Sequence, residues 1–97
     1  MKPLRFSWDN RKNKTNQKRH KISFEEAQTI FLDENAIEYY DPDHSEDEDR
    51  FLMLGLSYRV RILVVSYSLR SEGTEIRIIS TRKATKRGQE FYFRRKQ

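Results

Sequence analysis

Cationic side chains gather at the ends of two segments whose residues alternate as in β-strands. Arg70 ends the first segment, and Arg77, Arg82 and Lys83 lie in or just after the second. Arginine forks bind phosphate oxygens and stabilise the extra negative charge of a pentacoordinate phosphorus. Beside a hydroxyl or an imidazole, such residues suit cleavage of an RNA phosphodiester without a metal. They suit simple RNA binding as well, because basic strand ends with an aromatic residue also occur in RNA-binding domains that do not cleave.

Tyr67 and His20 are the candidates for proton transfer in such a reaction. Tyr67 alternates with Leu63 and Val65, so it emerges from the same strand face near the end of its segment. His20 stands in the basic run of residues 18–21, where neighbouring cations disfavour protonation and leave the imidazole able to accept a proton. The structural alternative for His20 is a helix-end histidine bonded to a backbone carbonyl. The sequence leaves the choice between Tyr67 and His20 open.

Hydrophobic periodicity predicts the elements that must position these residues. Ser23 with Glu26 forms a capping box for one helix, and Thr85 caps another. Tight links predict that the last three strands form an antiparallel meander. The predicted order β-α-α-β-β-β-β-α indicates one α+β domain over residues 1–97, with an antiparallel β-sheet and helices packed on one face. Strands are expected over residues 4–8, 36–40, 51–58, 60–69 and 74–82, and helices over residues 10–19, 24–32 and 85–96.

The last predicted strand divides its side chains between two faces. Strict alternation sends Ile76, Ile78, Ser80 and Arg82 one way, and Arg77 with its neighbours Ile79 and Thr81 the other way. An arginine flanked by isoleucines is not expected to be a free solvent charge. We expect Arg77 to pair with a carboxylate, to extend its charged end towards water, or to face a polyanion.

Charge is strongly partitioned along the chain. Residues 1–22 carry eight lysines and arginines against one aspartate, a net +7. Residues 23–50 carry eleven acidic residues against one arginine, a net −10, and residues 51–97 carry a net +8. Two basic thirds around an acidic centre are compatible with a polyanion on one surface and a basic partner on another. No apolar run approaches the length of a membrane span and no apolar region follows the first five residues, so we expect a cytoplasmic protein without membrane contact.

The acidic loop of residues 43–49 contains His44 and superficially resembles a metal site. Calcium loops need a glycine at the sharp turn and a glutamate at the twelfth position, and neither falls in register here. The absence of cysteine excludes thiolate zinc sites, disulfides and cysteine nucleophiles. We therefore expect no metal and no cofactor. The loop is interpreted as solvated surface or as a docking patch for a basic partner.

Several motifs follow one another along nearly the whole chain. They are Phe6-Ser7-Trp8-Asp9, Asn13-Lys14 with Asn16 and Lys18-Arg19-His20, Ile22-Ser23-Phe24-Glu25-Glu26-Ala27, Asp41-Pro42-Asp43-His44, Glu48-Asp49-Arg50-Phe51 with Leu54-Gly55, and Ile76-Arg77-Ile78-Ile79-Ser80-Thr81-Arg82-Lys83-Ala84-Thr85. In this order and spacing they resemble the BrnT family of type II toxins. The Trp-Asp start and the blocks that begin at His20 and Arg77 are jointly quite specific.

This resemblance implies a RelE-like fold and a metal-independent endoribonuclease that cleaves RNA and arrests translation. It also implies a cognate antitoxin of the BrnA type with a ribbon-helix-helix domain, which neutralises the toxin in a hetero-oligomer. Operator DNA would be bound only through that complex. The family pattern carries over to Lys18, His20, Arg50, Arg77, Arg82 and Lys83, and family members usually keep a basic residue near Arg70. We therefore expect Arg82 and Arg77 to be catalytic, with either Tyr67 or His20 for proton transfer. The expected RNA-binding residues are Lys18, Arg50, Arg70 and Lys83. The alternative is a non-catalytic module that binds RNA or the antitoxin and acts in autoregulation of its operon.

Two positions depart from the family pattern. Many relatives have histidine where this chain has Tyr67, and tyrosine, with an ordinary pKa of about 10, is a poorer base at neutral pH. Relatives commonly have glutamate where Gly88 stands, three residues after the predicted cap Thr85. That glutamate would complete a capping box, so Gly88 predicts a loosened C-terminal helix.

Overall fold

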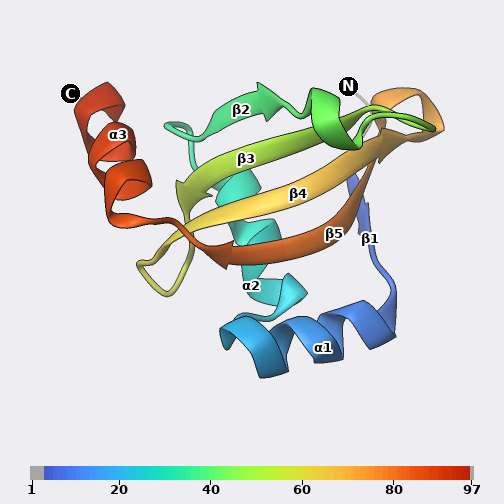
Figure 1. Cartoon of the computed structure of the whole chain (residues 1–97), viewed down its shortest axis with the longest axis horizontal. Coiled ribbons are helices and arrows are strands. Elements are labelled where there is room, and N and C mark those ends of the chain that lie inside the picture. Colours follow the sequence, from blue (N-terminus) through green and yellow to red (C-terminus); the bar gives the residue numbers. More distant parts are fainter. Residues whose placement is uncertain (1–3, 97) are drawn as a thin grey trace.

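The computed structural model describes residues 4–96 and forms a five-stranded β-sheet with α-helices around it (Figure 1). Short 3-10 turns follow α2, precede β3 and separate β4 from β5. The order of helices and strands along the chain agrees with the predicted order. The elements are β1 (Arg5–Ser7), α1 (Asn10–His20), α2 (Phe24–Gln28), β2 (Ile37–Tyr40), β3 (Arg50–Leu56), β4 (Ile62–Arg70), β5 (Glu75–Lys83) and α3 (Lys86–Lys96).

The sheet is mixed and has the strand order β1-β5-β4-β3-β2. Antiparallel pairing of β3 with β4 and of β4 with β5 confirms the predicted meander, and β2 extends it. β1, however, pairs in parallel with β5, so the expectation of an antiparallel, RelE-like sheet is only partly correct. After α2 the chain forms β2 at the opposite edge of the sheet, and β3, β4 and β5 follow in antiparallel order towards β1. β5 runs in the same direction as β1.

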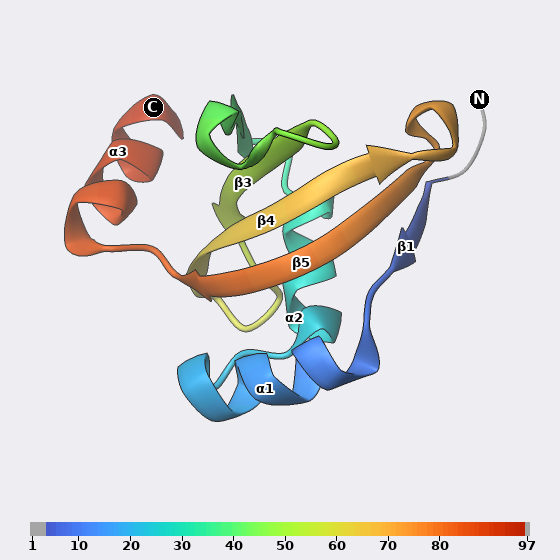
Figure 2. The same ribbon diagram turned by 45° about the vertical axis from the view of Figure 1, so that its right-hand side comes forward.

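The helices do not share one face of the sheet, which corrects that prediction (Figure 2). The face that carries Leu63, Val65 and Tyr67 packs against α2, and we call it the helical face. The other face carries the alternate residues of β4, and we call it the open face. At one end of the open face, Tyr92 of α3 packs with Leu54 and other apolar side chains of the sheet. The middle of the open face is left uncovered by helices (Figure 1).

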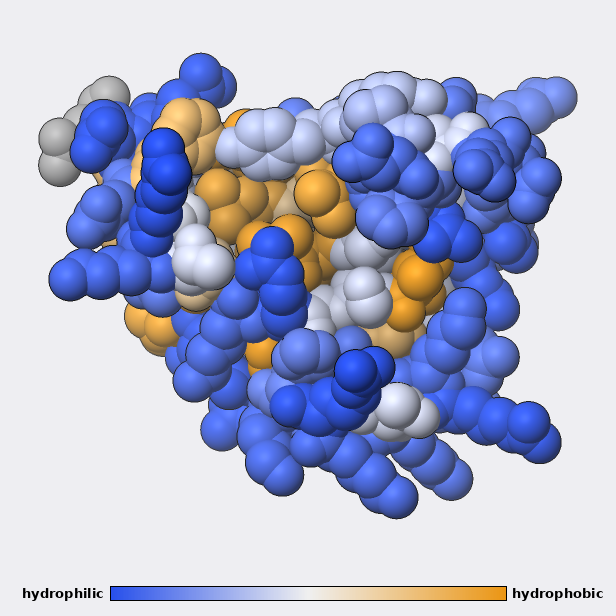
Figure 3. Space-filling view, viewed as in Figure 1, coloured by the Kyte–Doolittle hydropathy of each residue, from blue (hydrophilic) through white to orange (hydrophobic). Residues whose placement is uncertain are grey.

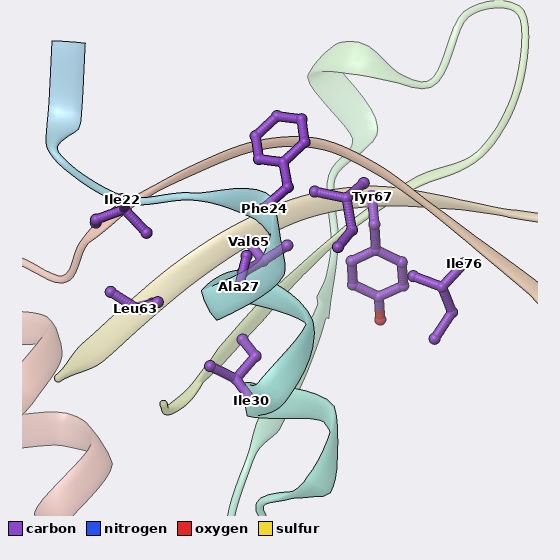
Figure 4. Close-up of a cluster of buried hydrophobic side chains, with 9 residues drawn as sticks. Ile22, Phe24, Ala27, Ile30, Leu63, Val65, Tyr67 and Ile76 are labelled. Atoms are coloured by element: carbon purple, nitrogen blue, oxygen red, sulfur yellow. The ribbon is translucent and has the colours of Figure 1, made fainter. Parts of the chain in front are cut away.

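The main core lies between α2 and the helical face (Figure 4). Phe24, Ala27 and Ile30 recur at helical spacing and are fully buried, as their periodicity predicts. They pack on Leu63 and Val65 of β4. The predicted helix over 24–32 is α2 followed by a 3-10 turn, Thr29–Leu32, which keeps the same apolar face towards the sheet.

Buried amides fix α1, which has no apolar stripe. Asn13 Oδ1 accepts a hydrogen bond from the backbone N–H of Phe24 at 2.8 Å. Asn16 Oδ1 accepts from the backbone N–H of Thr81 at 3.1 Å, and its Nδ2 donates to the carbonyl of Ile22 at 3.0 Å. Both asparagines are only 6% exposed, so these bonds satisfy backbone groups away from water. They hold α1 against β5 and so fix the position of its last residue.

The cap of α2 departs from a reciprocal capping box. Ser23 Oγ accepts from the backbone N–H of Glu26 at 3.0 Å, as predicted. The Glu26 carboxylate does not return to the cap but accepts from Arg61 Nε at 2.9 Å, from a second nitrogen of Arg61, and from Ser57 Oγ at 2.7 Å. Burial alone would raise the pKa of the Glu26 carboxyl, but these donors outweigh burial and hold that pKa below its usual range. The buried carboxylate therefore ties α2 to the loop between β3 and β4.

The start of α3 confirms the predicted cap. Thr85 Oγ1 accepts from the backbone N–H of Gly88 at 3.1 Å. A methyl group added at Gly88 would lie 3.4 Å from Ala84 Cβ and 3.5 Å from Thr85 Oγ1, which is ordinary contact. The helix therefore tolerates a side chain at this position.

Replacing Gly88 with alanine is expected to stabilise the fold by about 0.5–1 kcal/mol, because glycine loses more backbone freedom in a helix. Urea unfolding of the two proteins measures this. Gly73→Ala is the matched control: Gly73 has φ +88°, where a side chain is strained, so that variant should lose stability. A less stable Gly88→Ala protein would contradict this description of α3.

Candidate active site

A β-bulge in β5 decides which arginines share a face. Thr81 pairs with Val65 and Ser80 with Ser66, but Tyr67 pairs with Ile78, so Ile79 is an extra residue. An extra residue reverses the alternation of the side chains that precede it. Arg77 consequently lies on the same face as Arg82, whereas strict alternation predicted opposite faces.

The open face thus carries Arg82 and Arg77 from β5 and Arg50 from β3, as well as Arg70 from β4. Arg82 lies opposite Val64 of β4, and Arg77 lies opposite Ser68. Val64 and Ser68 are four residues apart, so the Cα atoms of the two arginines are separated by roughly 13 Å along the strand. Arg50 of β3 lies opposite Ser68 on its other side, two strand spacings or roughly 10 Å from Arg77. Long side chains at these spacings can reach a common anion.

His20 reaches this face from the end of α1. A cavity of about 100 Å³ is lined by His20, Ser66, Ser80 and Arg82, with Leu52 and Val64 among its apolar walls. His20 also borders an adjoining cavity of about 250 Å³, whose other lining residues include Arg11, Lys12 and Arg19. His20 and Arg82 therefore line the same small cavity, which lies beside a basic surface.

Carboxylates do not neutralise the arginines nearest this cavity. Among residues 4–96, the Arg77 side chain makes no hydrogen bond or ion pair, and the Arg82 side chain donates only to the backbone carbonyl of Lys83, at 3.2 Å. Arg50 Nε is buried without a hydrogen-bond partner in the same part of the chain. The guanidinium groups of Arg77 and Arg82 therefore retain their capacity to bind an external anion, whereas Arg50 lines a pocket together with carboxylates of the acidic loop, among them Glu48.

Tyr67 is not brought together with these arginines. It lies on the helical face among the buried side chains of the main core and is 1% exposed (Figure 4). Its ring packs against Phe31 and Phe51 at centroid distances of 5.0 and 5.7 Å. Its hydroxyl donates to Glu38, and burial together with this carboxylate raises its pKa. The geometry gives Tyr67 a packing role, which corrects its assignment as an alternative proton-transfer group.

The remaining sequence-predicted residues lie around the cavity rather than in it. Arg70 also lies on the open face, six residues along β4 from Val64, the partner of Arg82, which is roughly 20 Å along the strand. It forms an exposed ion pair of 3.4 Å with Glu48. Lys83 lies opposite Leu63 and so points to the face away from Arg82. Lys18 is exposed on α1.

Arg82, Arg77 and Arg50 form what we call the arginine row of the open face. The acidic loop lies near the Arg50 end of this row. Hydrogen bonding by Ser68, and then the charges of Arg70 and Arg50, hold the pKa of the Glu48 carboxyl below its usual range. His44 Nδ1 lies 2.9 Å from Asp41 Oδ2 at the other side of the loop. Within residues 4–96 no three His, Asp or Glu side chains are grouped to hold a metal ion.

Comparison with known proteins identifies the family. A family model described as the ribonuclease toxin, BrnT, of type II toxin–antitoxin systems matches residues 8–88. The chain belongs to the BrnT family. It is a ribonuclease toxin, which confirms the resemblance seen in its motifs and the predicted enzyme class. A type II system also implies an antitoxin partner.

The crystal structure of the Brucella abortus ribonuclease toxin BrnT, at 1.1 Å resolution, is similar to this fold. The two share 21% sequence identity with a TM-score of 0.63, and the match covers 86% of this chain and 99% of the Brucella chain. At this identity the likeness shows the fold. No curated protein matches the sequence.

Sequence reasoning missed the two serines of this BrnT-family cavity. Ser66 and Ser80 pair across β4 and β5 and line the space between His20 and Arg82. Nothing in the spacing of Ser66 indicates a site residue. Ser80 stands in a family motif and alternates with Arg82, but neither pattern indicates that it lines a cavity with His20. None of the helices within residues 4–96 has the length and apolar character needed to cross a bilayer.

Proposed function

We propose that this toxin is a metal-independent endoribonuclease whose reaction takes place at the cavity between His20 and Arg82. The observation that carries the proposal is the convergence of His20, Arg82 and Arg77 on one face, which depends on the bulge at Ile79. The two guanidinium groups have no carboxylate partners among residues 4–96. They supply the charge stabilisation, and the imidazole the proton transfer, that metal-free cleavage requires.

Each group has a defined role in the proposed reaction. His20 takes the proton of a ribose 2′-hydroxyl, and the 2′-oxygen then forms a bond to the adjacent phosphorus. The bond from phosphorus to the 5′-oxygen breaks, and the imidazolium returns its proton to that leaving oxygen. Arg82 and Arg77 bind the phosphoryl oxygens, on which negative charge accumulates in the pentacoordinate state. The products are a 2′,3′-cyclic phosphate and a 5′-hydroxyl.

Flanking RNA is held by charge. Arg50 extends the arginine row beyond Arg77, and the basic residues of α1, Lys18 among them, continue it past His20. Arg70 and Lys83 make outer backbone contacts in this proposal. Because each phosphate contact releases condensed counterions, binding should weaken steeply as salt increases.

The antitoxin is proposed to be a BrnA-type protein with a ribbon-helix-helix domain, and the hetero-oligomer to bind operator DNA through that domain. The toxin acts in the cytoplasm, where RNA cleavage arrests translation. The charge partition of the chain supports such a partner, because a cationic segment complements the net −10 of residues 23–50 and an acidic one complements the arginine row. Growth arrest on expression of the toxin alone, relieved by co-expression of the antitoxin, tests this part.

His20→Gln tests the proton-transfer assignment. The amide cannot shuttle a proton, so kcat is expected to fall by about 10²–10⁴-fold while KM changes little. Cleavage of a defined RNA in excess chelator measures both constants. The control is His44→Gln, which changes the second histidine of the chain, in the acidic loop, and should behave as wild type. An unchanged kcat for His20→Gln would show that this imidazole takes no part in the reaction, and fully intact RNA with the wild-type protein would favour the non-catalytic module.

A further inference from the structure

A second, larger groove adjoins the His20–Arg82 cavity on the open face. It has a volume of about 480 Å³, which is within the range of sites for small organic ligands. Its floor includes Leu52, Leu54 and Val64 of the sheet, and Tyr39 of β2 and Phe91 of α3 line it as well. Figure 3, taken from the side opposite α2, shows an apolar area in the middle of this face with hydrophilic side chains around it.

The groove and the cavity lie side by side. Both are lined by Leu52, Val64 and Arg82, so the Arg82 side chain stands at the boundary between them. A chain whose phosphate is bound at Arg82 would therefore place its next chemical group in the groove. In RNA that group is a ribose together with the nucleobase that it carries.

The walls of the groove suit the flat face of a base. The Tyr39 and Phe91 rings have centroids 6.4 Å apart and planes inclined by 40°, and both residues remain about 40% exposed, at 39% and 40%. Exposed aromatic rings beside cations are the common platform on which single-stranded RNA stacks its bases. The charged residues that line the groove are Arg82 and Arg87, with no carboxylate among the lining residues within 4–96.

We propose that this groove binds the nucleobase adjacent to the cleaved phosphodiester, with Phe91 and Tyr39 as the residues that stack on it. This inference rests on the proposed function, since the scissile phosphate is placed by Arg82 and His20. Cationic lining, and the boundary shared with the reaction cavity, favour RNA over a protein segment in this groove. Binding of the base at a fixed distance from the reacting phosphorus would make the groove the source of sequence preference.

The test combines one protein variant with one missing base. Three oligoribonucleotides with a single cleavage position are compared: one intact, and two that lack the base on the 5′ or the 3′ side of the cleaved bond. For wild type, one of the abasic substrates is expected to lose roughly 5- to 100-fold in kcat/KM, the range for one stacked base. Phe91→Ala should show that loss on the intact substrate and little further loss on the same abasic one.

Two further variants separate stacking from folding. Phe91→Leu keeps an apolar side chain in the groove without a ring, so it should retain the fold and still lose activity on the intact substrate. Phe93→Ala removes an aromatic ring of α3 that does not line this groove, and it should behave as wild type. The inference would be overturned if Phe91→Ala lost as much activity as wild type when the base is removed. It would also be overturned if Phe91→Ala lost antitoxin affinity but cleaved RNA as wild type does. Absence of all cleavage by wild type would instead overturn the proposed function and this inference with it.

Discussion

Replacing Arg82 with alanine is expected to lower kcat for RNA cleavage by about 10²–10³-fold, the usual effect of removing one preorganised donor to a developing oxyanion. Arg82 lines both the His20 cavity and the adjoining groove, so it lies beside the position that we propose for the reacting phosphate. Its only hydrogen bond to residues 4–96 is to the carbonyl of Lys83, so the fold does not depend on it. The thermal midpoint and the antitoxin affinity of the variant should stay near wild type.

Single-turnover cleavage of a defined RNA, with the protein in excess, separates this effect from slow product release. Arg82→Lys keeps the charge but not the bidentate fork, so it should recover only part of the lost rate. Arg94→Ala, which removes one exposed cation of α3, controls for net charge and should cleave as wild type. Equal rates for Arg82→Ala and Arg94→Ala would show that Arg82 acts only as general positive charge.

Replacing Glu26 with glutamine is expected to lower the free energy of unfolding by about 3 kcal/mol. Glu26 is 2% exposed and accepts from two nitrogens of Arg61 and from Ser57, so the variant leaves Arg61 without its counter-charge. Breaking a buried pair from one side costs about 3–5 kcal/mol, and the lower figure applies because Arg61 keeps some contact with water. Against a total of about 5–15 kcal/mol for a domain, the loss is large.

The pH dependence gives this prediction a second readout. The pKa of the Glu26 carboxyl is lower in the folded state than its ordinary value of 4.5. The ionised carboxylate therefore contributes to the free energy of unfolding above pH 4.5, and this contribution is lost as the pH falls through the lower pKa of the folded state. Urea unfolding at several pH values should therefore show the wild type and Glu26→Gln converging in acid. Glu34→Gln, on the exposed segment after α2, is the control. A constant difference between wild type and Glu26→Gln at all pH values would contradict the ionic role of Glu26.

Most elements of the fold could be predicted because local signals decide them. The capping serine and threonine, Ser23 and Thr85, accept the expected backbone bonds, and the apolar spacing of α2 matches its buried face. The direction of β1 could not be predicted, since alternation within a strand carries no information about its neighbour. Asn13 and Asn16 hold α1 in place of an apolar stripe, and only the folded chain shows which backbone groups they satisfy.

The candidate site was predicted in its residue types but not in its geometry. Arg77 and Arg82 were placed on opposite faces because Ile79 is as apolar as its neighbours and gives no sign that it is an extra residue. The bulge that it forms depends on the pairing of β4 with β5, a non-local property. The position of Tyr67 near a strand end suggested that it belongs to the site, but its side chain is buried in the core. His20 reaches the open face because Asn16 bonds to Thr81.

We propose that one imidazole, that of His20, and two arginines of the open face, Arg82 and Arg77, cleave RNA without a metal. The most direct measurement is end analysis of the products formed from a defined RNA in excess chelator, with a second substrate that carries a single 2′-deoxy sugar at the cleavage position. We expect fragments with a 2′,3′-cyclic phosphate and a 5′-hydroxyl from the first substrate, and no cleavage at that position in the second. Cleavage of the 2′-deoxy substrate, or cleavage that appears only when a divalent cation is restored, would contradict the claim.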